Sequence, residues 1–213
     1  MESIPVNAPD NISIIKPLGK GKSGYSYLAE MENRLVVYKL MHNEPCPYYS
    51  FKDNKVKLEV KAYEILKQIG IRIPRLISYD EDKAYLIKEY IEGKNGIEWL
   101  AFEAMDEEII SELFEMSFRL KGNKLNIDYF PPNFVIGQDG LYYIDYEVNP
   151  YDERWSLEKW GLYFWANRKG MAEYHKDGNW MHIIEDPDNG LPPKEPFEKT
   201  IKDWIVRFGF KKT

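Results

Sequence analysis

The sequence of 213 residues contains very little cysteine or histidine, and this scarcity excludes several kinds of site. Its one cysteine, Cys46, cannot form a disulfide within the chain or build a multi-cysteine metal site. Two of the three histidines, His175 and His182, are not spaced like zinc ligands. We therefore expect neither a disulfide nor a zinc centre.

The sequence also lacks a long apolar run and an excess of positive charge. No stretch is long enough to span a bilayer, and the N-terminal MESIPVNAPDNISIIK lacks the features of a signal peptide. The formal net charge of −6 argues against nucleic acid as the main partner, because such binding requires an excess of lysine and arginine. We expect a cytoplasmic protein with no membrane partner and no nucleic-acid partner.

Hydrophobic residues (44%) and aromatic residues (15%) are frequent enough to build a sizeable core. The N-terminal half is predicted to be rich in strands, with one helix. Apolar and β-branched runs indicate strands within 12–18, 25–28, 34–41, 71–80 and 83–93. Val56, Val60 and Tyr63 recur at helical spacing, which predicts a helix over about 52–68 that ends before Gly70. A linker is expected at 93–96.

The C-terminal half is predicted to be mostly helical. Helical periodicity indicates helices over 105–122, 156–170 and 197–210. Short strands at 134–137 and 141–147 flank the turn sequence QDG. Together the two halves predict an α+β fold in which an antiparallel sheet with one helix precedes a helical region.

The stretch GKGKSG contains three glycines, Gly19, Gly21 and Gly24. A Walker loop would need a glycine at position 16, which is Lys16, and both Walker and dinucleotide-binding loops must open a helix. Here the chain continues as a strand. Two interpretations stay open: a plain flexible hairpin, or a hairpin whose glycines let backbone N–H groups approach phosphates.

Two charged residues favour the phosphate-binding interpretation. Lys39 lies in the strand VVYKL, and Glu59 lies on the same helical stripe as Val56 and Tyr63, so it should face the strands. Glu64 should point away. Taken singly, each charge would be interpreted as part of a solvated surface.

A more specific pattern follows in LNIDYFPPNFVIGQDGLYYIDYE, which contains Asp128, then Asn133 after four intervening residues, and then Asp145. With the glycine hairpin, Lys39 and Glu59, this pattern resembles the protein-kinase-like superfamily. The resemblance is closest to the aminoglycoside/choline phosphotransferases and the small RIO-type kinases, which write the segment as HGDLHPGNIL…IDWE. The segments LEVKAYEILKQIGIRIPRLISYD and YLIKEYIEG also resemble passages of those families.

The resemblance implies a two-lobed fold, with an N-lobe over 1–92 and a C-lobe over 93–213. It implies ATP and Mg²⁺ as cofactors, with Asp128 orienting the acceptor hydroxyl and Asn133 and Asp145 holding the metal ion. The remaining implied roles are phosphate contacts from Gly19, Gly21, Gly24 and Lys39, an ion pair from Glu59 to Lys39, and backbone hydrogen bonds from Glu89 and Ile91 to adenine.

The sequence also departs from those families. It reads NID where protein kinases have His-Arg-Asp, carries Glu147 in place of the glycine of Asp-Phe-Gly, has Lys88 at an otherwise apolar hinge position and shows no long activation segment. Glu147 could assist the metal site, and Asp152 could brace the catalytic loop or cap the next helix.

The acceptor is not identified by the sequence. Tyr174 and Trp180, near Glu185, Asp186 and Asp188, would suit a cationic acceptor, or they could form a solvated loop with buried aromatics. Trp155, Trp160 and Trp165 are interpreted as core. Three functions stay open: a small-molecule phosphotransferase, which we favour, a RIO-like Ser/Thr protein kinase, and a nucleotide-binding pseudokinase.

Overall fold

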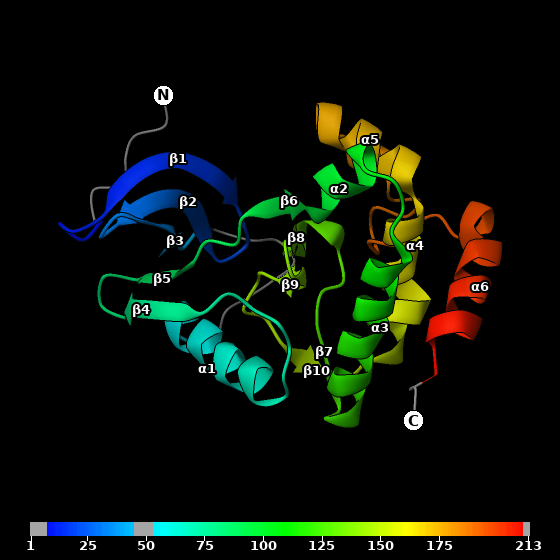
Figure 1. The fold of residues 1–213 in the computed structure, drawn as a ribbon, viewed down its shortest axis with the longest axis horizontal. Helices are drawn as coiled ribbons and strands as arrows, with labels where there is room; N and C mark the ends of the chain where they lie inside the picture. Colours follow the sequence, from blue (N-terminus) through cyan, green and yellow to red (C-terminus); the bar gives the residue numbers. More distant parts are fainter. Residues whose placement is uncertain (1–7, 45–52, 211–213) are drawn as a thin grey trace. The chain divides into compact units, whose positions relative to one another are not determined.

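The computed structural model describes residues 8–44 and 53–210. Cys46 lies outside these residues. The chain forms two compact units (Figure 1). The first unit comprises Met1–Ile65 and Pro74–Ile91, and the second comprises Leu66–Ile73 and Glu92–Thr213.

The first unit is built on a five-stranded antiparallel sheet in the order β1-β2-β3-β5-β4. The strands are β1 (Ser13–Lys20), β2 (Gly24–Met31), β3 (Arg34–Met41), β4 (Leu76–Asp80) and β5 (Tyr85–Glu89), and the helix α1 covers Lys55–Gln68. Glu32 and Asn33 join β2 to β3 with φ angles of 52° and 60°. Two left-handed residues give a hairpin turn whose twist matches that of its strands. The strands predicted for this half are therefore confirmed in kind and order.

The two faces of this sheet have different chemistry because side chains alternate along a strand. Val36 and Tyr38 of β3 are buried in an apolar cluster with Ala29 and Ile87. Lys39 has the opposite parity and pairs with Leu86 of β5, so its side chain belongs to the other face. The apolar cluster thus fixes the direction in which Lys39 points.

The second unit is mainly helical, with two small sheets in the orders β10-β7 and β6-β8-β9 (Figure 1). Its strands are β6 (Gly93–Asn95), β7 (Leu125–Asn126), β8 (Phe134–Gly137), β9 (Gly140–Tyr143) and β10 (Asn149–Pro150). Its α-helices are α2 (Gly96–Phe102), α3 (Glu107–Gly122), α4 (Leu162–Ala166), α5 (Arg168–Asp177) and α6 (Glu198–Phe208). Within the described ranges, no helix has the length and apolar character needed to cross a membrane.

Two expectations for this region were wrong. The predicted linker at 93–96 is β6 and the start of α2, where Asn95 and Glu98 form a reciprocal capping box. The predicted helix over 156–170 is interrupted: a wide helical turn at Leu157–Gly161 precedes α4, and Asn167 then caps α5 through Gly170 N–H. Asn167 ends α4 and begins α5, because its side-chain oxygen accepts the Gly170 N–H in place of a backbone carbonyl oxygen.

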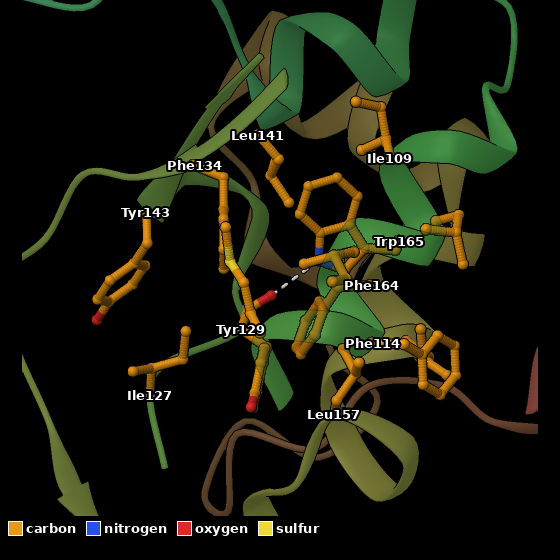
Figure 2. Packing of buried hydrophobic residues seen from close by; sticks show 14 of the residues in the cluster. Ile109, Phe114, Ile127, Tyr129, Phe134, Leu141, Tyr143, Leu157, Phe164 and Trp165 are labelled. Atoms are coloured by element: carbon orange, nitrogen blue, oxygen red, sulfur yellow. Dashed lines mark hydrogen bonds between the residues drawn. The ribbon is translucent and has the colours of Figure 1, made fainter. Parts of the chain in front are cut away.

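The core of the second unit gathers around Trp165, which is fully buried (Figure 2). Its ring contacts Trp99 and Phe134, and its Nε1 donates to the carbonyl oxygen of Tyr129 at 2.9 Å. Trp160 packs partly buried against this cluster. Trp155, however, is 39% exposed, so its assignment to the core was wrong. It lies in a short 3₁₀ turn, Glu153–Trp155, that contributes no buried residue.

Candidate functional site

In the first unit, Lys39 and Glu59 form a buried ion pair. The Nζ atom of Lys39 lies 2.6 Å from Oε1 of Glu59, and both side chains are less than 10% exposed. Val56 and Tyr63 are buried on the same stripe of α1 as Glu59, whereas Glu64 is exposed. The helical period therefore selects Glu59 as the partner of the strand lysine, because positions three and four residues apart share a face.

Ser23 is a third member of this cluster, and the sequence analysis did not identify it. Its hydroxyl donates to the same Oε1 atom of Glu59 at 2.7 Å. The second oxygen of Glu59, Oε2, is buried and accepts no hydrogen bond from the part of the chain that the structure describes. The tip of the glycine hairpin is thus tied to α1. No sequence signal could have shown this, because the contact depends on how far the hairpin bends.

The three glycines of the hairpin differ in how much room a side chain would have at each position. At Gly24 an added Cβ would lie 2.5 Å from the carbonyl oxygen of Leu40, so packing against β3 excludes a side chain. At Gly19 a Cβ would meet nothing within 4 Å, and at Gly21 only the Gly24 oxygen at 3.8 Å. The missing side chains at Gly19 and Gly21 leave room for a ligand to approach the backbone, which fits a phosphate group.

The residues at the end of β5 are partly engaged by protein groups. The N–H of Glu89 donates to the carbonyl oxygen of Arg75 at 2.9 Å, and its carboxylate accepts from the Arg75 N–H at 3.1 Å. Ile91 follows two residues later and is half-buried. The Glu89 amide is therefore not available to a nucleotide base in this structure.

In the second unit, a network of hydrogen bonds fixes the loop that carries Asp128. Oδ1 of Asp128 accepts from the Phe130 N–H at 3.0 Å, and its carbonyl accepts from Nδ2 of Asn133 at 3.3 Å. The bond from Trp165 to Tyr129 anchors the middle of the loop, and Gly161 packs directly against Tyr129. Pro131 begins a 3₁₀ turn that ends at Asn133. These contacts hold one carboxylate and one amide side chain in a defined arrangement.

The hairpin of β8 and β9 brings Asn133 and Asp145 together. Phe134 pairs with Tyr143, and beyond this pair the Ile144 N–H donates to the carbonyl oxygen of Asn133 at 2.9 Å. Asp145 follows Ile144 directly. The turn sequence QDG thus sets the register that places the two proposed metal ligands on neighbouring segments.

Tyr143 is a further member of this group that the sequence analysis did not identify. Its side chain is fully buried, and its hydroxyl donates to the carbonyl oxygen of Glu147 at 3.1 Å. Burial raises the pKa of Tyr143 well above its usual range, and the carboxylates of Asp145, Glu147 and Asp128 raise this pKa further. The backbone of Asp128 acts on the pKa in the opposite direction. The hydrogen bond to Glu147 closes the chain from Tyr143 to Glu147 across Asp145.

The two open questions about Glu147 and Asp152 have structural answers. Oε1 of Glu147 accepts from Nδ2 of Asn149 at 3.0 Å, so a protein donor already holds this carboxylate. Asp152 accepts from the Arg154 N–H and thereby caps the 3₁₀ turn that follows. The Arg154 guanidinium lowers the pKa of Asp152 through the hydrogen bonds of their ion pair. Asp152 therefore acts as a cap.

The donor set suits Mg²⁺ better than a transition metal. Across 8–44 and 53–210, no three or more His, Cys, Asp or Glu side chains gather as a metal site. Asn133 and Asp145 offer one amide oxygen and one carboxylate, because Nδ2 of Asn133 is used by Asp128. Mg²⁺ characteristically takes one or two protein oxygens and completes its shell with water and phosphate oxygens.

Aromatic side chains gather around Phe130, two residues after Asp128, within the second unit. The ring of Phe130 stacks on Trp180 with centroids 5.4 Å apart, and Tyr174 contacts Trp180 at 4.9 Å. Trp180 is 48% exposed. Nearby acids are engaged by protein groups: Asp177 pairs with His182, and Asp186 accepts from Asn189. The surface formed by Phe130, Tyr174 and Trp180 is thus mainly aromatic.

The comparison with curated proteins relates the chain to protein kinases. Over 156 residues it is 29% identical to Aurora kinase B of the mouse, Mus musculus, an alignment that covers 70% of this chain and 43% of the mouse protein. The chain therefore spans less than half the length of this relative. No family model matches the sequence. The similarity and the antiparallel sheet followed by helices are compatible with a protein-kinase-like fold.

Proposed function

We propose that this protein is a phosphotransferase that uses ATP and Mg²⁺ and transfers the γ-phosphate to a hydroxyl of a small molecule. The observation that carries the proposal is the loop system of the second unit, where Asp128, Asn133 and Asp145 are joined through hydrogen bonds of their own segments. The buried pair of Lys39 and Glu59 in the first unit supplies the matching phosphate-binding group. The similarity to a mouse protein kinase supports the same reaction class.

In this reaction Asp128 orients the acceptor hydroxyl. The acceptor oxygen forms a bond to the γ-phosphorus while the bond from that phosphorus to the β,γ-bridging oxygen breaks, and ADP leaves. The hydroxyl proton passes to the carboxylate of Asp128 and then to water. A carboxylate suffices because the loose transition state needs a positioned hydroxyl more than a fully deprotonated one.

The other residues bind the phosphate groups of ATP and the metal ion. Lys39 contacts the α- and β-phosphates, and Glu59 keeps its ammonium in place. Gly19 and Gly21, which carry no side chain, leave room for the phosphate groups to approach the backbone of the hairpin. Asn133 and Asp145 would hold Mg²⁺, which neutralises developing charge on the phosphates when bound.

A small-molecule acceptor is favoured by the segment that follows Asp145. The chain runs from Asp145 directly to β10 at Asn149 and then to the helical turn at Leu157. This leaves no long segment for displaying a peptide beside Asp128. The aromatic surface of Phe130, Tyr174 and Trp180 suits a planar or cationic acceptor through stacking and cation–π contacts. The similarity to a mouse protein kinase favours a protein acceptor as the second candidate.

The decisive test is release of ADP from Mg-ATP with panels of amines, sugars, aminoglycosides and unstructured proteins. We expect turnover that depends on a small-molecule hydroxyl and falls by at least about 1000-fold in Asp128→Asn. Asp139→Asn, an exposed aspartate in the β8–β9 turn, is the matched control and should retain activity. Turnover only with proteins would favour the second candidate.

Nucleotide binding is measured separately by thermal melting with ATP and Mg²⁺. A rise in melting temperature without turnover for any acceptor would support the pseudokinase alternative. If ATP and Mg²⁺ do not change the melting temperature and no acceptor is turned over, the proposed function is wrong.

A further inference from the structure

The hydroxyl of Tyr143 closes the segment that carries a proposed metal ligand. It donates to the carbonyl oxygen of Glu147 at 3.1 Å, which closes the chain from Tyr143 to Glu147 into a loop around Asp145. The Ile144 N–H of this loop donates to the carbonyl oxygen of Asn133 at 2.9 Å, so the loop is joined to the segment of the other proposed metal ligand. One hydroxyl therefore holds the loop that carries Asp145 alongside the segment of Asn133.

The rest of Tyr143 is held rigidly. The side chain is fully buried at the end of β9, its ring contacts Phe134 at 5.3 Å, and its N–H donates to the carbonyl oxygen of Arg72 at 3.0 Å. Phe134 pairs with Tyr143 in the hairpin register and directly follows Asn133. A ring fixed in this way can only place its hydroxyl at one position, so the hydroxyl is a rigid anchor for the carbonyl group of Glu147.

We propose that the Tyr143 hydroxyl is a positioning group that holds the loop of Asp145 in the geometry required to bind Mg²⁺. This inference rests on the proposed function. Transfer is sensitive to the placement of its groups, and a displacement of about 1 Å can cost about 100-fold in rate. Without the hydroxyl, the Glu147 carbonyl loses this donor, and the loop around Asp145 can shift to find another.

The substitution Tyr143→Phe removes the hydroxyl and keeps the ring. Its matched control is Tyr142→Phe on the neighbouring residue, whose hydroxyl bonds to Asp139 in the exposed turn. For Tyr143→Phe we expect kcat to fall by about 10- to 100-fold and half-saturating Mg²⁺ to rise by at least about 3-fold. The KM for ATP should change by less than about 2-fold, because the first unit supplies the proposed phosphate contacts. Tyr142→Phe should match the wild type in all three constants.

Hydrogen exchange provides a readout that does not need turnover. In Tyr143→Phe, peptides that include Asp145 and Glu147 should exchange their amide hydrogens at least about 3-fold faster than in Tyr142→Phe, at a temperature where both variants are folded. Unchanged exchange would show that the hydroxyl does not hold this segment and would overturn the inference. A fall in kcat that only follows the loss of folded protein, with half-saturating Mg²⁺ unchanged, would also overturn it, since that result indicates a structural role alone.

The two hypotheses fail in different ways. If the wild type binds no Mg-ATP and turns over no acceptor, the proposed function is wrong and the catalytic role of Tyr143 falls with it, whatever the exchange rates. If the wild type is active and Tyr143→Phe retains its kcat and Mg²⁺ dependence, the proposed function stands and the inference about Tyr143 is wrong.

Discussion

The ammonium of Lys39 and the carboxylate of Glu59 lie 2.6 Å apart in an environment where each side chain is less than 10% exposed. Removing one member of a buried ion pair is strongly destabilising, because the remaining buried charge loses that counter-charge. The pair therefore couples β3 to α1 within the first unit.

The first prediction concerns this pair. Glu59→Gln should lower the free energy of unfolding by about 3 kcal/mol, because the charge of Lys39 then lacks the carboxylate. In the double variant Lys39→Met/Glu59→Gln, part of this loss should return, with a coupling energy of about 1 kcal/mol or more. Urea denaturation of the single and double variants measures the loss in the free energy of unfolding and the coupling energy. Glu64→Gln, on the exposed face of the same helix, should change stability by less than about 0.5 kcal/mol, and equal effects of the two glutamine variants would refute the prediction.

The second prediction concerns the hydrogen bond from Ser23 to Glu59, which ties the glycine hairpin to α1 at 2.7 Å. Ser23→Ala should remove about 1–2 kcal/mol of local stability, because the acceptor is a carboxylate. Amide hydrogens of Gly21 and Gly24 should then exchange about 5- to 30-fold faster. Ser13→Ala, at an exposed position of β1, is the control and should leave this exchange unchanged. Equal exchange in both variants would show that Ser23 does not secure the hairpin.

The third prediction concerns Gly161, where the helical turn before α4 approaches the loop of Asp128. A Cβ at this position would lie 2.5 Å from Cβ of Tyr129 and 3.2 Å from Cδ1 of Leu157. Gly161→Ala should therefore lower the free energy of unfolding by about 1–3 kcal/mol through overpacking. Gly122→Ala, at the end of α3 with nothing within 4 Å, should be neutral or stabilising by up to about 1 kcal/mol. Differential scanning calorimetry should show shifts in melting temperature that are opposite or clearly different for the two variants. The same shift in melting temperature for both variants would contradict the packing argument.

The fourth prediction concerns alkaline pH. Burial, with smaller contributions from Tyr85 and Tyr27, raises the pKa of Tyr38 from 10 to about 12. In the unfolded chain the phenol ionises near pH 10, whereas in the folded state it stays neutral up to about pH 12. Its contribution to the free energy of unfolding is therefore complete below pH 10 and is lost as the pH rises towards 12. Tyr38 should account for a loss of about 2 kcal/mol in the free energy of unfolding over this interval.

The alkaline effect is measured by urea denaturation at a series of pH values. Tyr38→Phe should show a shallower decline between pH 10 and pH 12 than the wild type. Tyr79→Phe, which removes the hydroxyl of a tyrosine that is 47% exposed on β4, should follow the wild type. A decline in Tyr38→Phe as steep as in the wild type would rule out the phenol of Tyr38 as its source.

The sequence by itself determined the α+β organisation and most of the elements. Alternation of apolar residues indicated the strands of the first sheet, and the period of Val56, Glu59 and Tyr63 predicted which face of α1 meets that sheet. These features can be predicted because each depends on the conformation of a few consecutive residues. The same local logic failed at 93–96, where a capping box rather than a linker begins α2.

Only the tertiary structure decided which distant groups share a hydrogen bond. Ser23 meets Glu59 because the glycine hairpin bends towards α1, and Tyr143 meets Glu147 because the register of β8 and β9 places its ring in the core. The sequence lists these residues without indicating their contacts, because a serine or tyrosine has no periodicity that reveals its partner. Such contacts depend on hairpin register and on close approaches like that of Gly161 to Tyr129, which are properties of the folded chain as a whole.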